Sequence, residues 1–300
     1  MQLAERCVQS NLAWKTDLYA AYHFENANSA KRTVFHYQLP LPPEEEKHFL
    51  ARTGILPKDR MDFYQQLAMC VQRNLDISSY LKQAGVTSTL AFSNAEQETD
   101  ENGVAHIYLE SQNVLPVLSH FLYGSSANAI TIMDLVYRVA IIFRDIAKHG
   151  VTYRGFDLNE VFINDEGKFL LGGFYYADCT EVERYTDYLP NRSMNLPDAL
   201  LRGETGTQMI DIQSLCMSAW NLFSGIPHDA KMMPGRLVFP EYATEEIAQL
   251  LVSGMSAATV KDCNQFRRNW LNLRKQLGET DFSQAVVPLR KQLLKDFQYV

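Results

Sequence analysis

The residues best suited to chemistry lie in one stretch of the chain, residues 149–178. Among its carboxylates, Asp157, Glu160 and Asp178 are the candidates to accept a proton or bind a cation. Two glycines, Gly155 and Gly173, stand among them. Acids of this kind form a catalytic centre only where they reach within about 3 Å of one reacting position, so the elements that carry them decide what they can do.

A hairpin is predicted between the two glycines. Residues 161–163 and 168–171 are short apolar runs, and Asn164-Asp-Glu-Gly167 between them is typical of a four-residue turn with Gly167 at positive φ. A helix is predicted before the stretch, from Ile130 to His149, because apolar residues recur there at spacings of three and four. Gly150 is a typical residue for ending such a helix.

This stretch resembles the catalytic segment of the eukaryotic-type protein kinases, in which His-Arg-Asp leads through an Asn to a hairpin and then to Asp-Phe-Gly. On that pattern the motifs become Tyr153-Arg154-Gly155, Glu160 and Gly173-Phe174-Tyr175. In the family, the first Asp orients the attacking hydroxyl, and the Asn and the second Asp hold the magnesium ions. The resemblance therefore implies a kinase-like scaffold, kept at Arg154 and Phe174, without its catalytic base and its main metal ligand.

Two later segments carry the same resemblance. Asp198, in Leu196-Pro197-Asp198, stands at the Glu of the family's Ala-Pro-Glu. Asp211 and Ser214 match the Asp-x-Trp-Ser that opens the family's buried central helix, with Gln213 in place of the Trp. The resemblance implies that Asp211 holds the backbone of the loop around Arg154, as the family's Asp does.

The N-terminal part matches the family less closely. Strands are predicted at residues 17–25 and 32–39, which would be the second and third strands of a kinase small lobe. The family's Val-Ala-Ile-Lys then falls on residues 33–36, which places His36 at the phosphate-binding lysine. The loop that covers the phosphates needs glycines, and the first glycine of this chain is Gly54.

A helix is predicted after Pro57, where it would correspond to the family's helix C. Its apolar positions are Met61, Tyr64, Leu67, Ala68 and Val71. This face puts Gln66, with Gln65 as the alternative, at the Glu that pairs with the lysine in the family. An imidazole at His36 opposite an amide cannot form that ion pair.

Two other segments could carry interactions. Residues 94–103 are acidic and are predicted to be a solvated loop between strands at residues 87–92 and 104–110. Residues 282–300 carry an apolar stripe at helical spacing, with basic residues between, and are predicted to pack back on the helical part of the chain.

Composition excludes several classes of protein. The net charge of −7 argues against nucleic acid as a main partner, since binding to phosphates needs a positive face. The five cysteines include no C-x-x-C, the seven histidines show no metal-ligand spacing, and no eighteen-residue apolar run occurs. We therefore expect a cytoplasmic protein with no membrane insertion.

These observations predict an α+β, two-lobed protein kinase-like fold over nearly all of residues 10–275. A small β-rich lobe with helix C would span residues 1–112, and a larger, mainly helical lobe with a C-terminal helical extension would span residues 113–300. The predicted function is that of a pseudokinase that binds another protein as a scaffold or allosteric regulator, without a cofactor or metal. Two alternatives stay open: a phosphotransferase that uses Asp157, Glu160 or Asp178, and a protein that binds nucleotide without turnover, free of metal.

Overall fold

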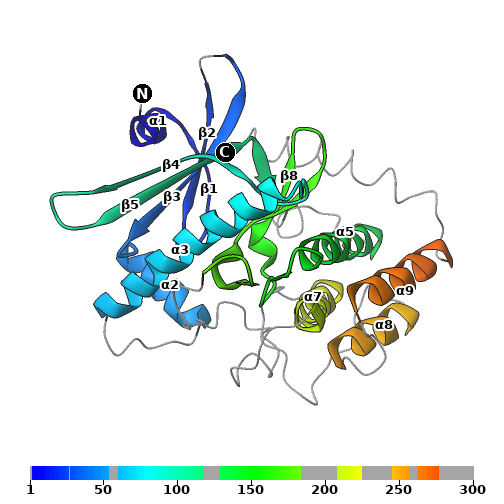
Figure 1. Cartoon of the computed structure of the whole chain (residues 1–300). Helices are drawn as coiled ribbons and strands as arrows, with labels where there is room; N and C mark the ends of the chain where they lie inside the picture. Colours follow the sequence, from blue (N-terminus) through cyan, green and yellow to red (C-terminus); the bar gives the residue numbers. More distant parts are fainter. Residues whose placement is uncertain are drawn as a thin grey trace.

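The computed structural model describes residues 2–26, 28–53, 60–117, 129–183, 208–224, 245–256 and 262–276 of the 300-residue chain. Within these ranges the protein is of mixed α+β class, with a five-stranded antiparallel sheet and seven α-helices (Figure 1). The α+β class predicted from the sequence is therefore confirmed. The helices are α1 (Leu3–Gln9), α2 (Pro43–Thr53), α3 (Arg60–Gln83), α5 (Ala129–Ala147), α7 (Gln208–Phe223), α8 (Glu245–Ser256) and α9 (Cys263–Gln276).

The five strands of the main sheet lie in the order β1-β2-β3-β5-β4, and each neighbouring pair is antiparallel. Phe35 of the central strand β3 pairs with Ala21 of β2 on one side and with Leu109 of β5 on the other. The strands are β1 (Leu12–Lys15), β2 (Ala20–Glu25), β3 (Lys31–Leu39), β4 (Phe92–Thr99) and β5 (Ala105–Gln112).

A tight turn joins β1 to β2. Thr16 Oγ1 accepts hydrogen bonds from the backbone N–H groups of Leu18 and Tyr19, which closes the turn with a side chain. The strand predicted from residue 17 therefore begins only at Ala20, and the prediction was wrong by three residues. No glycine is needed for this turn, because a threonine side chain supplies the acceptor.

The two faces of the sheet are covered by different helices, because successive residues of a strand point to opposite faces. On one face, Tyr37 of β3 is buried in a cluster with Leu67 of α3. On the other face, Val34 packs against Leu3 of the short helix α1. The face toward α3 is the one that can contribute side chains to the region around residues 153–176.

The acidic segment predicted to be a loop is an edge strand instead. β4 pairs with β5 from Phe92 to Thr99, and Figure 1 shows the long hairpin that the two strands form. Only the turn at residues 100–103 is free of ladder pairing, and Asp100 closes it by accepting N–H bonds from Asn102 and Val104. The prediction was wrong because polar residues on a solvated edge give no apolar alternation to mark a strand.

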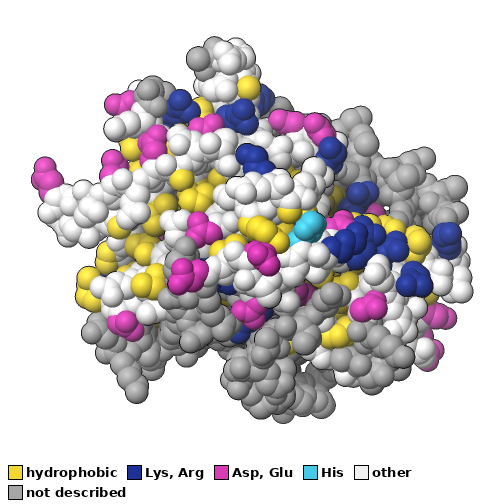
Figure 2. Space-filling view, in the orientation of Figure 1, with side chains coloured by type: hydrophobic (Ala, Val, Ile, Leu, Met, Phe, Trp, Pro, Cys, Tyr) yellow, Lys and Arg dark blue, Asp and Glu magenta, His cyan; other side chains and the backbone are white. Residues whose placement is uncertain are grey.

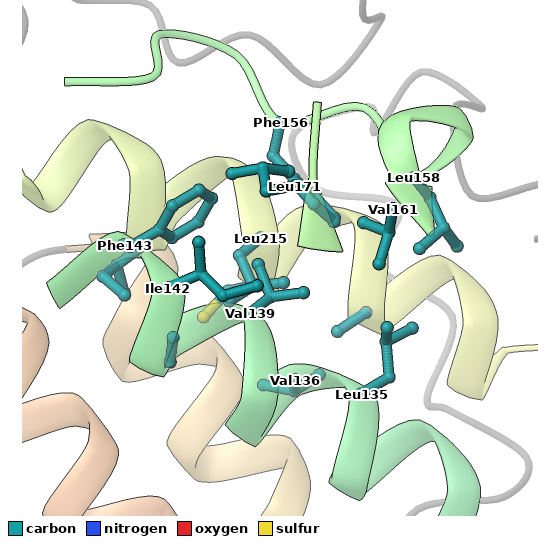
Figure 3. Close-up of a cluster of buried hydrophobic side chains, with 14 of the residues drawn as sticks. Leu135, Val136, Val139, Ile142, Phe143, Phe156, Leu158, Val161, Leu171 and Leu215 are labelled. Atoms are coloured by element: carbon teal, nitrogen blue, oxygen red, sulfur yellow. The ribbon is translucent and has the colours of Figure 1, made fainter. Parts of the chain in front are cut away.

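The later helices pack around α5. Trp270 Nε1 of α9 donates a hydrogen bond to the Met133 carbonyl of α5 at 2.9 Å, and both residues are buried. Figure 3 shows the apolar face of α5, including Val139 and Ile142, directed toward Leu215 of α7. This confirms the helix predicted from Ile130 to His149, which ends at Ala147 and is followed by Gly150 at φ 70°.

Smaller elements lie between the sheet and these helices. The predicted hairpin is confirmed, with Gly167 at φ 78° in its turn. It belongs to a three-stranded sheet in the order β6-β8-β9, while β7 and β10 form a separate pair. The bounds are β6 (Val114–Pro116), β7 (Val151–Thr152), β8 (Val161–Asn164), β9 (Phe169–Leu171) and β10 (Asp178–Cys179), with short 3₁₀ helices η1 (Leu158–Glu160) and η2 (Phe174–Tyr176).

Charge is unevenly distributed over the surface. Figure 2 shows a group of Lys and Arg side chains toward the side of the molecule that carries α5 and α9, and acidic side chains scattered over the whole view. Helix α9 contains no Asp or Glu, whereas the whole chain has a net charge of −7. In the part of the chain that the structure describes, none of the helices is both long enough and apolar enough to cross a membrane.

Candidate functional site

Side chains of α7 bind the backbone of the loop that contains Arg154 and Gly155. The carboxylate of Asp211 accepts hydrogen bonds from the backbone N–H groups of Tyr153 and Arg154, both at 2.8 Å. One turn further along α7, Ser214 Oγ accepts the N–H of Phe156 at 2.9 Å. The hydrogen bonds expected of Asp211 are therefore present.

Burial perturbs the ionisation of Asp211. Loss of solvent raises the pKa of this carboxyl from 3.8 to about 7, against the two backbone hydrogen bonds, which lower it. The nearby Asp178 adds to the increase, and Arg154 opposes it. Asp211 is thus a buried carboxyl whose role is to hold backbone, at a position that solvent does not reach.

Arg154 and Gly155 adopt left-handed backbone conformations, with φ of 62° and 94°. The guanidinium of Arg154 is buried, and its Nη1 donates to Asp178 Oδ1 at 3.1 Å. Asp178 lies on β10, which pairs with β7 immediately before the loop. Asp178 therefore neutralises a buried arginine and fixes the loop to β10.

Asp157 also has a local structural partner. Its side chain accepts the backbone N–H of Asn159 at 2.9 Å and so caps η1, the single turn that leads to Glu160. The residue is 3 % exposed. One oxygen of its carboxylate is therefore engaged within its own loop.

Glu160 and Gly173 lie against each other. A β-carbon added to Gly173 would lie 2.4 Å from Glu160 Cγ and 2.8 Å from Oε2, and Gly173 has φ of 71°. Glu160 is 2 % exposed, and its carbonyl accepts the N–H of Gly172 at 2.9 Å. The Glu160 side chain therefore fills the space into which a side chain at residue 173 would project.

The structure corrects the predicted place of His36. This residue points to the sheet face opposite α3, where its ring stacks on Tyr108 at 4.5 Å and its Nε2 lies 2.9 Å from His106 Nδ1. Gln66 is half-buried on α3 and Gln65 is exposed, so neither can face His36 across the sheet. The prediction that His36 lies opposite Gln66 was wrong, because a difference of one residue in position reverses the face to which a strand side chain points.

Tyr37 occupies the position toward α3 that was predicted for His36. Its hydroxyl is hydrogen-bonded to that of Tyr175 at 2.8 Å, and both rings are buried. This contact joins β3 directly to η2, across 138 residues of sequence. Local patterns could not have predicted it.

Helix α3 is tied to the same region by two polar residues. Asn74 Oδ1 accepts the N–H of Phe174 at 2.9 Å, and Arg73 Nε donates to the carbonyl of Ala177 at 2.7 Å. Both side chains are buried. The segment from Phe174 to Ala177 therefore has a fixed position against α3.

Aromatic rings fill the region between the sheet and the β8–β9 hairpin. Phe35 and Phe162 are both buried, and their ring centroids lie 5.6 Å apart in an edge-on arrangement. Trp14 of β1 packs against both rings, at 5.9 and 6.2 Å. From the β1–β2 turn, Tyr19 packs edge-on against Phe35 at 5.2 Å. These contacts join strand β1, strand β3 and the hairpin through side chains.

Asp198 lies outside the described residues. Among the residues that the structure does describe, no three His, Cys, Asp or Glu side chains are grouped so that they could hold a metal ion. The five cysteines are free thiols, and burial raises the pKa of Cys7 to about 12.

No family model matches the chain, and no curated protein does.

Proposed function

We propose that this protein is a pseudokinase, with a two-lobed kinase-like fold that binds another protein and does not transfer phosphate. The antiparallel sheet with α3 across one face supports the small lobe of such a fold. The helices packed on α5 support the larger one, and each part has its own large buried cluster. The bonds from Asp211 to the loop at Arg154 support the same assignment.

One observation carries the absence of phosphoryl transfer: the packing of Glu160 against Gly173. Kinases use the corresponding positions to hold magnesium ions against the phosphates, which requires an acid at the second position. Here that position has no side chain, and a β-carbon there would overlap Glu160. An acid at residue 173 would therefore clash with Glu160, and a single substitution at Gly173 cannot restore the metal ligand.

The aromatic cluster argues against nucleotide in the same region. In the kinase resemblance, nucleotide would lie between the sheet and the β8–β9 hairpin. Phe35, Phe162 and Trp14 are in mutual contact there, so a purine ring would have to displace aromatic side chains that already bury one another. At the β1–β2 turn, Leu18 and Tyr19 are buried under the sheet, where the family's glycine loop would cover phosphates.

The alternative enzyme is less well supported, because each of its candidate acids has a contact that holds the structure together. Asp157 caps η1, Asp178 pairs with Arg154, and Glu160 packs on Gly173. A general base has to be directed at a reacting position and able to exchange its proton there. These three contacts favour a scaffold role.

Titration with ATP while following thermal unfolding tests the proposal. The midpoint temperature should not change with ATP alone or with ATP plus magnesium or manganese, whereas an active protein kinase measured in parallel should be stabilised. Transfer of labelled phosphate to the chain or to a generic substrate should be absent. A metal-dependent increase in midpoint temperature, or any incorporation that Glu160→Gln abolishes, would contradict the proposal.

The protein-binding part is tested in cells that lack the endogenous protein. A Glu160→Gln chain keeps the volume of the side chain and removes its charge, so it cannot serve as a general base. If the protein acts by binding, this variant should restore the wild-type phenotype and recover the same partners at the same yield. Failure of a folded Glu160→Gln variant to do so would indicate chemistry.

A further inference from the structure

Strand β4 forms an open edge of the main sheet. Among the described strands it is the last in the order β1-β2-β3-β5-β4, so only its β5 side is paired. Figure 1 shows the β4–β5 hairpin projecting beyond the other strands of the sheet. At residues 93–99 every side chain is exposed except that of Glu96, which is half-buried. An added strand could therefore lie along β4 without displacing a described core side chain.

The register of the hairpin shows which backbone groups face the open side. Asp100 N–H donates to the Val104 carbonyl at 2.9 Å, so this pair is a hydrogen-bonded one. Successive residues of an antiparallel strand direct their backbone groups to opposite sides, so those of Glu98 face β5, and those of Gln97 and Thr99 face away. Within the described ranges these outward N–H and C=O groups make no hydrogen bond. They form a free ladder of the kind that pairs with an added strand.

The free ladder is bounded at both ends. Asn94 Oδ1 accepts the outward N–H of Ala95 at 2.9 Å, and the pairing with β5 is irregular between Phe92 and Asn94. At the other end the chain turns back after Thr99. An extended segment of about five residues would span the ladder, since paired strands match residue for residue.

Two acids stand beside the free ladder on one face of the sheet. Glu96 and Glu98 share the face of Tyr108, opposite α3. Glu96 accepts the N–H of Leu3 at 2.6 Å, and Glu98 accepts the hydroxyl of Tyr108 at 3.1 Å, so both carboxylates are held on that face. Neither acid forms an ion pair with any described residue, and the sequence contains no Lys or Arg at residues 83–137. Their charges are therefore available to a partner.

We propose that β4 binds an extended segment of another protein that carries Lys or Arg at alternate positions. In an antiparallel addition, the partner residues opposite Glu96 and Glu98 belong to non-hydrogen-bonded pairs, in which the side chains are closest. Basic residues two apart lie on one face of a strand and can meet both acids. The residue between them pairs with Gln97 through the backbone. This inference rests on the protein-binding part of the proposed function and gives that part a class of partner.

A second copy of this chain fits the edge poorly. Two β4 strands paired about Gln97 would place Glu96 of each copy opposite Glu98 of the other. Pairing about either glutamate would place that residue opposite itself. Like charges directly opposite each other destabilise a strand pair, so the acids favour a basic partner over self-association.

Synthetic hexapeptides, titrated into the isotope-labelled full-length chain, test the charge pattern. Acetyl-Val-Lys-Thr-Lys-Val-Thr-amide has its lysines on one face, and acetyl-Val-Lys-Lys-Thr-Val-Thr-amide has the same composition with its lysines on opposite faces. The first peptide should shift the backbone amide signals of Gln97 and Thr99, and the second should bind at least about threefold more weakly. A peptide with glutamates in place of the lysines should not shift these signals.

Backbone methylation of the first peptide tests the ladder. An N-methyl group on the central threonine removes the N–H that would bond to Gln97, so binding should be lost. An N-methyl group on the second lysine replaces an N–H that points away from β4, so binding should be kept. Equal effects of the two methyl groups would show that the peptide does not add as an antiparallel strand.

Variants of the chain assign the binding to β4. Gln97→Pro removes an outward N–H at a position where an edge strand tolerates proline, and should weaken binding about tenfold. Glu98→Gln keeps an oxygen for the Tyr108 hydroxyl and removes the charge, and should weaken binding about threefold. Glu44→Gln removes the same charge from the exposed first turn of α2 and should bind as the wild type does.

The wild-type titration decides the proposal without any variant. If the alternating peptide leaves the Gln97 and Thr99 signals unchanged, or if the two lysine peptides bind equally, the proposal is overturned. The ATP titration that tests the pseudokinase proposal does not involve β4. Failure of the strand addition and failure of the pseudokinase proposal therefore appear in separate measurements.

Discussion

Glu160 occupies the space in front of Gly173, so that a β-carbon on this glycine would lie 2.4 Å from Glu160 Cγ. In the kinase resemblance the two residues correspond to the two metal-holding positions. In this chain the side chain of Glu160 leaves no room for a side chain at residue 173. In that resemblance, Glu160 stands at the position of an amide and Gly173 at the position of an acid. The pair has become a packing contact in which both residues are buried.

This contact predicts an unusual cost for Gly173→Ala. An L-residue in the left-handed region costs about 1–2 kcal/mol, and overlap in a packed interior adds about 1–3 kcal/mol to the loss of unfolding free energy. Gly85 is the matched control, because it has φ of 80° and nothing within 4 Å of an added β-carbon. Denaturant unfolding should show that Gly173→Ala costs more than Gly85→Ala.

The extra cost should disappear when Glu160 is shortened. In a Glu160→Ala background, Gly173→Ala should cost no more than Gly85→Ala does in the wild type. The difference between the two backgrounds is the interaction energy of a double-mutant cycle. An identical cost for Gly173→Ala in both backgrounds would show that the two residues do not compete for space.

Asp211 and Ser214 predict a graded loss of stability. Asp211→Ala leaves two buried N–H groups without an acceptor, those of Tyr153 and Arg154, whereas Ser214→Ala leaves one, that of Phe156. Each unpaired buried donor costs about 1–3 kcal/mol, so the free energy of unfolding should fall about twice as far for Asp211→Ala. If Asp211→Ala is tolerated as well as Ser214→Ala, then α7 does not hold the loop through this carboxylate.

The β8–β9 hairpin, the helix α5 and the role of Asp211 could be predicted because their signals are local. The turn at Asn164 to Gly167 depends on residues adjacent in sequence, and the helix ending before Gly150 shows its own periodicity and stop signal. Asp211 is far from Arg154 in sequence, yet the motif that begins at Asp211 marks its role. In each case the evidence lies within one short segment.

The contacts that the sequence did not reveal depend on distant parts of the chain or on strand register. The bond between Tyr37 and Tyr175 links two unremarkable tyrosines, and the packing of Glu160 on Gly173 requires knowledge of the loop's exact path. The misplacement of His36 has a simpler physical origin. A shift of one residue in β3 exchanges the two faces of the sheet, and both faces of this strand carry bulky or buried residues, so composition does not distinguish them.

The raised pKa of Asp211 predicts a stability term that acts in the unusual direction for a carboxyl group. Since burial raises this pKa from 3.8 to about 7, the folded protein holds the proton more tightly than the unfolded chain does. The contribution is therefore complete below pH 3.8 and is lost as the pH rises to about 7. The stability of the wild type relative to Asp211→Asn, which does not titrate, should fall across this window.

Measurement of both proteins by denaturant unfolding at closely spaced pH values checks this term. Effects of other ionisable groups are common to both proteins and cancel in the difference. If the two backbone N–H groups outweigh burial, Asp211 stays ionised throughout, and the difference should be flat or should rise with pH.

His36 predicts a term of opposite sign in an overlapping window. Burial, with the nearby charges of His106 and Lys15, lowers the pKa of His36 from 6.5 to about 4. The folded state therefore binds this proton more weakly than the unfolded chain, and stability present above pH 6.5 is lost as the pH falls toward 4. His36→Phe keeps a ring to stack on Tyr108 and does not titrate, so the wild type should lose stability relative to this variant as the pH falls.

The pH-dependent contributions of His36 and Asp211 to the free energy of unfolding partly cancel in the wild type. The pH profile of the wild type alone therefore conceals both, and each contribution appears only in comparison with its own variant. A wild-type minus His36→Phe difference that is constant from pH 7 to pH 4 would show that the imidazole is solvated, and that the ring pair on the outer face of the sheet is open to water.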